Sequence, residues 1–355
     1  MTTSLRILLA GGSGLMGEPT ARALRSAGHA VTVLSRGERP LRGGAEGAEW
    51  LRADRKDERS LAAALAGRAF DLTLDLLAYD GADVARLLDV RGFSTARYVM
   101  ISTGQVYLVA AQRTPPFTEE HAGRPAMPEP EAGTRNWHNW VYGMGKRAAE
   151  SELFARRERG LSALALRLPV VQGAGDPSRR LWAYLQRMLD GGPLLLPEGG
   201  AWPVRFVWSE DVARAVALLA GGAWPGVGAL NLAMPDEPTL ESFLRRAAAC
   251  AGREPQLVEC TEQQCEAEGL DPRLSPFSGP WCSRPDPALA ARELGWTGTS
   301  SEEWLPLVVR AHLDERNPEP HPEYAQRAEE WAFARRLGWR GGASPSDQPA
   351  RGNSD

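Results

Sequence analysis

The sequence predicts an α/β protein: a doubly wound parallel sheet in the first half, followed by a smaller C-terminal α/β lobe. Short apolar, β-rich runs alternate with helical stretches up to about residue 168. This order is typical of parallel strands covered by helices on both faces. Beyond that point helices and short strands mix without regular alternation. The length of 355 residues accommodates two domains.

The elements of the first half are short and closely spaced. The expected strands are residues 5–10, 30–34, 48–51, 70–77, 97–102 and 161–168. The expected helices are residues 15–26, 60–66, 82–88 and 141–159. Residues 104–135 contain five prolines and are predicted to be a long loop. Loops of this length in a compact α/β domain commonly cover an active site.

The second half yields mainly helices. They are predicted at residues 179–189, 211–219, 240–251, 287–294 and 300–313, with one more within 318–338 and a strand at 229–232. We expect residues 1–175, with further sheet elements from about 204–235, to form a Rossmann-type dinucleotide-binding domain. Residues 176–340 are expected to be mainly a substrate-binding lobe, and residues 341–355 a disordered tail.

The composition excludes several classes of protein. With 43% hydrophobic and 24% charged residues, usage is that of an ordinary globular chain. A net charge of -4 argues against a strongly basic nucleic-acid binder. No apolar run approaches the roughly 18 residues of a membrane helix, and the N-terminus does not read as a signal peptide, so we expect a cytoplasmic protein. The four cysteines form no C-x-x-C pair, so we predict ordinary thiols and no metal site.

A glycine-rich turn follows the first strand. Gly11, Gly14 and Gly17 are spaced three apart, with Leu15 and Met16 leading into the helix. The first glycine permits a tight turn, the second lets the backbone approach a pyrophosphate, and the third allows close helix–strand packing. The free N–H groups and positive dipole end of the helix favour phosphate. This context predicts a dinucleotide site.

The end of the second strand sets the expected choice between dinucleotides. An acidic residue there binds the ribose 2′-hydroxyl of NAD, whereas an arginine accommodates the 2′-phosphate of NADP. Here Ser35 and Arg36 follow the strand, and neither Asp nor Glu ends it. We therefore expect NADP(H) to be preferred, with NAD(H) as the alternative.

Tyr142 and Lys146 form a Y-x-x-x-K pair on a predicted helix. Residues four apart share one helix face, so both side chains can enter one site. A tyrosine has an ordinary pKa near 10, and a neighbouring ammonium lowers the pKa of its phenol toward neutral pH. Thr103 lies at the tip of the strand at 97–102, where parallel sheets bind ligands, and its hydroxyl can contact a substrate oxygen.

These motifs, in this order, resemble the extended short-chain dehydrogenase/reductase superfamily of the NAD-dependent epimerase/dehydratase type. Other segments of the family pattern are residues 167–176 and 204–213. The resemblance implies a nicotinamide cofactor, Tyr142 as acid/base, Lys146 as its partner and Thr103 as the substrate contact. It also implies further cofactor contacts at Asp54, Leu76, Leu77, Ala78, Pro169 and Val170. Residues 33–37 and 53–57 resemble segments of the branch that contains chloroplast stem-loop-binding proteins and many bacterial relatives.

The resemblance implies hydride transfer at a hydroxyl or carbonyl carbon of a small molecule, such as a sugar or sugar nucleotide, with a homodimer as one assembly. Gly104 and Gln105 replace the Asp-Glu pair of dehydratases, which favours a reductase or epimerase. The long loop weakens the case for a nucleotide-sugar substrate, and we expect its His138 to be a solvated loop residue. An RNA-binding relative and a cofactor-sensing regulator are the alternatives.

Overall fold

The computed structural model describes residues 4–316 and 318–341. The expected tail at 342–355 therefore lies outside the described residues. The chain divides into two compact units, one of Met1–Gly173, Arg205–Pro235 and Ser283–Thr299, the other of Ala174–Val204, Asp236–Cys282 and Ser300–Asp355. Among the described residues, no helix is long and apolar enough to cross a membrane. That the second unit binds substrate stays a prediction.

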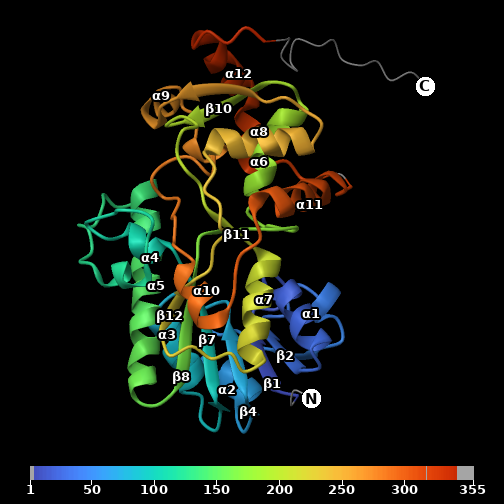
Figure 1. Cartoon of the computed structure of the whole chain (residues 1–355), viewed down its shortest axis with the longest axis vertical. Helices are drawn as coiled ribbons and strands as arrows, with labels where there is room; N and C mark the ends of the chain where they lie inside the picture. Colours follow the sequence, from blue (N-terminus) through green and yellow to red (C-terminus); the bar gives the residue numbers. More distant parts are fainter. Residues whose placement is uncertain (1–3, 317, 342–355) are drawn as a thin grey trace. The chain divides into compact units, whose positions relative to one another are not determined.

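The first unit is built on a seven-stranded sheet in the order β12-β8-β7-β5-β1-β2-β3 (Figure 1). All neighbouring strands in it are parallel. The strands are β1 (Arg6–Ala10), β2 (Ala30–Ser35), β3 (Glu49–Arg52), β5 (Leu72–Asp75), β7 (Arg97–Thr103), β8 (Ser162–Leu168) and β12 (Ala229–Asn231). The predicted doubly wound parallel sheet is confirmed.

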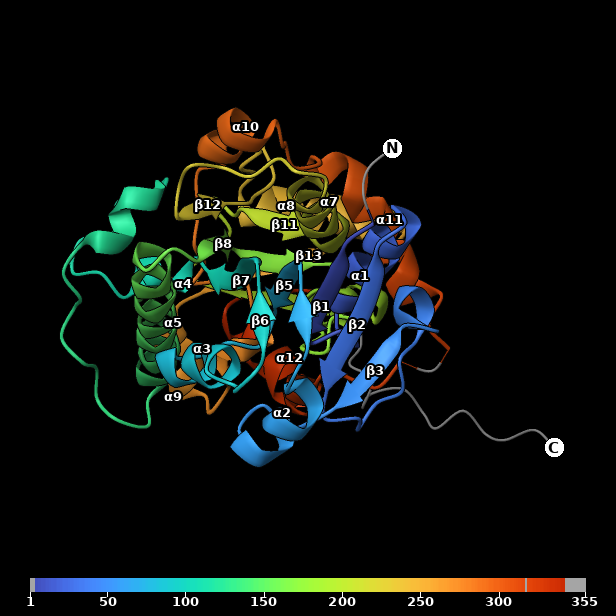
Figure 2. The same ribbon diagram turned by 90° about the horizontal axis from the view of Figure 1, so that it is seen from below.

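Helices cover both faces of this sheet (Figure 2). One layer contains α1 (Gly17–Ser26), α7 (Ser209–Ala220) and α10 (Ala288–Leu294), and the other contains α2 (Glu58–Leu65), α3 (Gly81–Leu88) and α5 (Arg135–Glu158). Side chains of a strand point alternately to opposite faces. In β1, Ile7 and Leu9 join the core under α1, whereas Leu8 and Ala10 join the core under α3 and α5.

Two predicted boundaries of the first unit were wrong. The expected strand at 70–77 is split between β4 (Ala69–Phe70), which pairs with β6 (Ser94–Thr95), and β5. Helix α5 begins six residues before the expected 141, because Thr134 caps it by accepting a hydrogen bond from the amide of Trp137 at 3.1 Å. The expected loop at 104–135 also holds the short helix α4 (Gln105–Leu108) and the 3-10 turn η2 (Glu119–Gly123).

The second unit combines helices with a two-stranded parallel sheet of β10 (Pro193–Pro197) and β13 (Gln256–Cys260). These strands and the short helix α9 (Glu262–Ala267) were not predicted. The helices α6, α8 and α11 lie near the expected positions, and the last expected helix is the 3-10 turn η4 followed by α12. Their bounds are α6 (Arg180–Leu189), α8 (Leu240–Cys250), α11 (Ser301–Leu313), η4 (Pro322–Gln326) and α12 (Arg327–Arg336).

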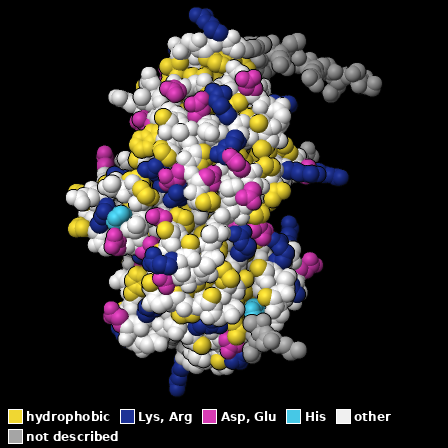
Figure 3. All heavy atoms as spheres, viewed as in Figure 1, with side chains coloured by type: hydrophobic (Ala, Val, Ile, Leu, Met, Phe, Trp, Pro, Cys, Tyr) yellow, Lys and Arg dark blue, Asp and Glu magenta, His cyan; other side chains and the backbone are white. Residues whose placement is uncertain are grey.

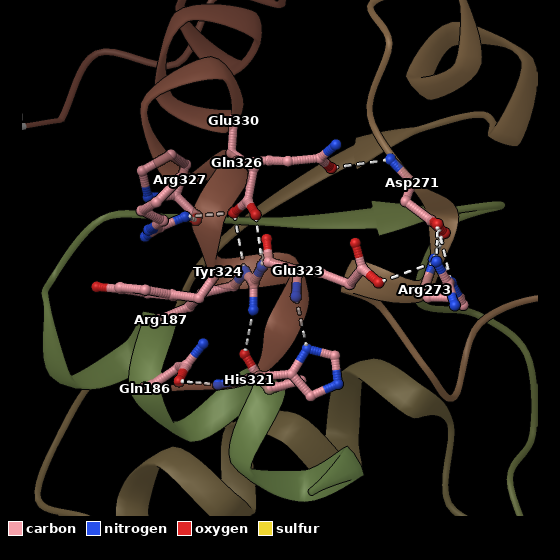
Figure 4. Close-up of polar contacts among 12 residues, drawn as sticks. Gln186, Arg187, Asp271, Arg273, His321, Glu323, Tyr324, Gln326, Arg327 and Glu330 are labelled. Carbon is pink, nitrogen blue, oxygen red and sulfur yellow. Dashed lines mark hydrogen bonds and ion pairs between the residues drawn. The ribbon is translucent and has the colours of Figure 1, made fainter. Parts of the chain in front are cut away.

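A buried ionic cluster joins α12 to α6 within the second unit (Figure 4). Arg187 of α6 and Glu330 of α12 are fully buried and form a two-point ion pair, one contact of which measures 2.8 Å. Arg327 donates to the same carboxylate at 2.7 Å and also binds Asp190. Charges this deeply buried are stable only when paired, so the cluster fixes where α12 packs.

Candidate functional site

Two glycines of the turn after β1 are required by the fold itself. Gly11 has φ +103°, a conformation that side chains strongly disfavour, and a Cβ there would lie 2.9 Å from Cγ of Leu77. A Cβ on Gly17 would lie 2.2 Å from the carbonyl oxygen of Gly11. Helix α1 therefore begins in direct backbone contact with the end of β1, as the glycine spacing predicts.

The middle glycine has a different environment. A Cβ on Gly14 would meet no atom within 4 Å, so packing of the chain does not require glycine there. The backbone amides of Gly14, Leu15 and Met16 find no acceptor among the residues the structure describes. Amides that cluster at the start of the ten-residue helix α1 form an anion-binding surface. These residues fit a dinucleotide pyrophosphate.

The ends of β2 and β3 carry the predicted adenosine contacts. Ser35 ends β2, and its hydroxyl accepts a hydrogen bond from the indole N–H of Trp50 at 2.9 Å. Arg36 forms an ion pair with Glu38 at 3.0 Å, with side chains 63% and 65% exposed. Asp54 follows β3, is exposed, and accepts from the amide of Lys56 at 2.9 Å. The structure places all three beyond the carboxyl ends of neighbouring strands.

The segment Leu76, Leu77 and Ala78 follows β5 and is positioned by the buried carboxylate of Asp75. Asp75 accepts the amide of Leu77 at 2.8 Å and two hydrogen bonds from Arg55 at 2.7 and 3.0 Å. Although burial raises its pKa, the Arg55 guanidinium and the hydroxyl of Tyr98 hold the pKa of Asp75 below its ordinary value. One signal of this network can be read in the sequence, which is an aspartate inside an apolar run.

Tyr142 and Lys146 are brought to the same edge of the sheet by α5. Lys146 is 3% exposed, and its Nζ donates to the carbonyl of Ala78 at 2.7 Å and to that of Ile101 at 3.0 Å. It lies 6.0 Å from the ring centre of Tyr142, which is 37% exposed. Burial lowers the pKa of Lys146 to about 8. The ammonium is therefore anchored by carbonyls at the ends of β5 and β7.

A second tyrosine shares this position and was not predicted. Tyr79 is 52% exposed, and its ring centre lies 5.0 Å from Nζ of Lys146 and 6.3 Å from the ring centre of Tyr142. Only its place directly after the predicted 76–78 segment could have indicated it. Lys146 thus lies beside two aromatic rings, both of which can attract its positive charge.

The residues between Tyr142 and Lys146 explain how α5 comes so close. A Cβ on Gly143 would lie 2.5 Å from Cγ1 of Val109, and one on Gly145 would lie 2.8 Å from the carbonyl oxygen of Tyr79. The helix is therefore packed against α4 on one side and the segment after β5 on the other. This packing fixes the position of Tyr142 and Lys146 relative to the carboxyl ends of β5 and β7.

Thr103 is the last residue of β7, and its hydroxyl accepts a hydrogen bond from the amide of Gln105 at 3.3 Å. Pro169 and Val170 follow β8, where β9 (Val170–Gln172) pairs with β11 (Phe206–Trp208). All of the predicted site residues therefore belong to the first unit. Each follows, ends or faces the carboxyl end of a strand, as expected for ligand sites of parallel sheets.

A buried ion pair supports this edge from α5 and β8. Glu150 binds Arg167 through two contacts at 2.7 and 2.9 Å and accepts the hydroxyl of Ser102 at 2.5 Å. Arg167 continues to the hydroxyl of Tyr107 at 3.1 Å, which donates to Asn231 at 2.6 Å. Sequence reasoning identified Arg167 only as part of a family segment, because Glu150 and Tyr107 gave no separate signal.

His138 corrects an expectation from the sequence. It is exposed, as predicted, but it lies on α5 rather than in a loop, one turn before Tyr142. Its ring packs edge-to-face on Trp137, with centres 5.0 Å apart. No cluster of three or more His, Cys, Asp or Glu side chains suited to a metal ion occurs among the described residues.

Comparison with known proteins identifies the family. The sequence model of the NAD dependent epimerase/dehydratase family matches residues 7–223, more than half of the chain. The chain belongs to this family. Its first unit therefore has the sheet and glycine turn of an epimerase/dehydratase-type protein.

Relatives of this epimerase/dehydratase-family chain include two named proteins. A 2′-dehydrokanamycin reductase of Streptomyces kanamyceticus is 31% identical over 230 residues, 63% of this chain and 60% of the relative. Chloroplast stem-loop binding protein of 41 kDa b from Arabidopsis thaliana is 23% identical over 266 residues, 71% and 65% of the two chains. The chain thus spans less than two thirds of the length of either relative.

Solved structures of similar fold include MoeE5 in complex with UDP-glucuronic acid and NAD, with a TM-score of 0.64 and 21% identity. This match covers 87% of the present chain and 99% of MoeE5. A putative epimerase from Burkholderia cenocepacia gives a TM-score of 0.66 at 19% identity, over 88% and 99% of the two chains. At such identities these matches establish the fold.

Proposed function

We propose that this epimerase/dehydratase-family protein is an NAD(P)-dependent reductase or epimerase that acts at a hydroxyl or carbonyl carbon of a small molecule. The observation that carries the proposal is the position of Lys146. Its Nζ is bound to carbonyls of Ala78 and Ile101 and lies beside the Tyr142 ring. The glycine turn after β1 lies at the same edge of the sheet. The proposed cofactor site and the proposed proton-transferring residues are therefore at one edge of the sheet.

The chain offers a contact for each part of a dinucleotide. The amides at Gly14 to Met16 would bind the pyrophosphate, and Asp54 would contact the adenine. Leu76 to Ala78, with Pro169 and Val170, would line the remainder. A bound nicotinamide ring supplies the carbon that gives or receives the hydride. Arg36 supports a preference for NADP(H), while the family description and the NAD-bound structural neighbour keep NAD(H) as the alternative.

Tyr142 would move the proton of the reacting oxygen. The charged ammonium of Lys146 favours the phenolate form of Tyr142, so the phenol gives up its proton more readily near neutral pH. The two carbonyl contacts hold that ammonium in place. Thr103 would donate its hydroxyl hydrogen to the same substrate oxygen, since its own lone pair accepts the amide of Gln105.

The substrate proposal follows from the same residues. Gly104 stands next to Thr103, and a Cβ there would lie 2.0 Å from Oγ of Ser283, so the chain leaves no room for a dehydratase-type acidic side chain. A reductase or epimerase is therefore favoured. One relative is named as a reductase of 2′-dehydrokanamycin, and one structural neighbour was solved with UDP-glucuronic acid. These names support a polyhydroxylated small molecule bearing an alcohol or ketone.

The RNA-binding alternative gains no support from the distribution of charge. On the face shown in Figure 3, Lys and Arg lie among Asp and Glu rather than in one basic patch. Proteins that bind nucleic acid without sequence readout depend on such a patch. This face therefore gives no reason to prefer RNA binding to the enzymatic proposal.

The experiment that tests the proposal compares the wild-type protein with Tyr142→Phe. Both proteins should bind NADPH or NADH in a fluorescence titration, because Tyr142 is not needed to hold the pyrophosphate. With a panel of sugar and aminoglycoside ketones, only the wild type should oxidise NADPH, and the variant should lose at least about 100-fold in rate. If the wild type binds neither dinucleotide, or if Tyr142→Phe turns over normally, the proposal is wrong.

A further inference from the structure

Arg52 is the last residue of β3 and lies near Arg36, the predicted contact for the 2′-phosphate of NADP. In the parallel pairing of β2 with β3, Arg52 is the register partner of Ser35. The two strands therefore end side by side, and Arg36 is the first residue after β2. This edge of a dinucleotide-binding sheet is where the adenosine ribose is recognised. Sequence reasoning considered only Arg36, because register between strands is not visible in the sequence.

The Arg52 guanidinium is held on a fixed platform. Its central carbon lies 4.3 Å from the ring centre of Trp50, two residues earlier on the same face of β3. Trp50 is itself tied to β2, because its indole N–H donates to the hydroxyl of Ser35 at 2.9 Å. An arginine stacked on an aromatic ring loses less freedom when it binds a ligand, and its planar fork matches phosphate.

The turn after β2 crosses over the Arg52 side chain. Gly37 has φ +87°, and a Cβ there would lie 3.1 Å from Cδ of Arg52. Glycine at this position lets the backbone approach the arginine stem. The turn that carries Arg36 therefore approaches the Arg52 side chain closely, so both arginines lie at the same edge of the sheet.

The two arginines differ in their partners. Arg36 is already paired with Glu38 at 3.0 Å, so a phosphate would have to compete with that carboxylate. Arg52 makes no ion pair with any residue that the structure describes. A cation that is held by an aromatic ring, and that has no carboxylate to neutralise it, keeps its charge available for an anion.

We propose that Arg52, on the Trp50 platform, is the principal contact for the 2′-phosphate of NADP(H), with Arg36 as the secondary one. The inference rests on the dinucleotide site of the proposed function. It makes β3, rather than the turn after β2, the main determinant of cofactor choice. It also predicts that preference for NADPH over NADH survives when Arg36 is removed.

The test measures binding of NADPH, NADH and the fragments 2′,5′-ADP and 5′-AMP to the whole chain at one fixed ionic strength. Arg52→Ala should weaken NADPH and 2′,5′-ADP by about 10- to 100-fold, as expected for loss of a charge-assisted contact. It should leave NADH and 5′-AMP within about twofold. Arg36→Ala should weaken NADPH by a smaller factor. Arg59→Ala, an exposed arginine on α2, removes the same charge and should change nothing.

The outcomes separate this inference from the proposed function. Binding of NADPH by Arg52→Ala at wild-type strength overturns the inference, and so does a larger loss in Arg36→Ala than in Arg52→Ala. A wild type that binds NADH as tightly as NADPH also overturns it, while the enzymatic proposal stands. A wild type that binds neither dinucleotide overturns both. Unchanged thermal melting of Arg52→Ala shows that a selective loss of NADPH binding is not a folding defect.

Discussion

Burial of Lys146 predicts a measurable link between pH and stability. The sequence contains two lysines, Lys56 and Lys146. Burial lowers the pKa of Lys146 to about 8, against an ordinary value near 10.4. Labelling with [13Cε]lysine should therefore show one signal that titrates near pH 8, and Lys56→Arg, which removes the other lysine signal, assigns it to Lys146. At pH 7 Lys146 would be about 90% charged.

The sign of the stability effect follows from linkage. A lysine whose pKa is lower in the folded chain than in the unfolded chain destabilises the fold while it is protonated in both. That cost is fully present below about pH 8 and disappears as pH rises toward the unfolded pKa. Between pH 7 and pH 10 the folded state should therefore gain roughly 2–3 kcal/mol from this residue.

The matched variant is Lys146→Met, which keeps an unbranched side chain of similar length without a charge. Urea unfolding of both proteins at pH 7, 8, 9 and 10 gives the difference in their free energies of unfolding, in which contributions of other groups cancel. The wild type should gain roughly 2–3 kcal/mol relative to Lys146→Met across this range. A difference that stays constant with pH, or a Lys146 signal that titrates above pH 10, would refute the reasoning.

Two other perturbations test separate parts of the structure. Gly14→Ala should leave the free energy of unfolding within about 0.5 kcal/mol, because its Cβ would meet no atom of the described residues within 4 Å, but it should weaken NADPH binding at least about tenfold. Gly17→Ala should lose about 3 kcal/mol or more of stability or fail to fold, because its Cβ would lie 2.2 Å from a backbone carbonyl oxygen. Equal effects of the two on folding would contradict this. Glu330→Gln should cost about 3–5 kcal/mol, since it leaves two buried arginines short of a partner (Figure 4). The exposed neighbour variant Glu329→Gln should change the melting temperature little, and similar melting of the two proteins would show that the cluster contributes no stability.

The sheet and glycine turn were predictable because their signals are local. Apolar runs of strand length, separated by helices, indicate parallel strands wherever the chain alternates in this way. The spacing of Gly11, Gly14 and Gly17 can be read in seven residues. The start of α5 was missed because prolines, tryptophans and a histidine around it are poor helix signals, although Thr134 is a good N-cap.

The supporting residues of the site were not predictable because they depend on register between distant segments. Asp75 meets Arg55 across twenty residues, and Glu150 meets Arg167 across seventeen. The proposed role of Arg52 depends on the pairing of β3 with β2, which places it beside Ser35. Each of these side chains looks like an ordinary charged residue until the strands are aligned. The sequence thus identifies candidate ligand-binding residues more readily than the residues that hold them in place.

The segment from Tyr142 to Lys146 contains two features that lower the stability of a helix, at the place where we propose that the chemistry occurs. Two glycines inside a helix cost about 1 kcal/mol each relative to alanine, and a buried ammonium adds to that cost. Both features follow from close approach, because Gly143 contacts α4 and Gly145 contacts the backbone of Tyr79. At this approach Nζ of Lys146 reaches the carbonyl of Ala78, which follows β5, and that of Ile101 in β7. The surrounding sheet and helices offset the energetic cost of this arrangement.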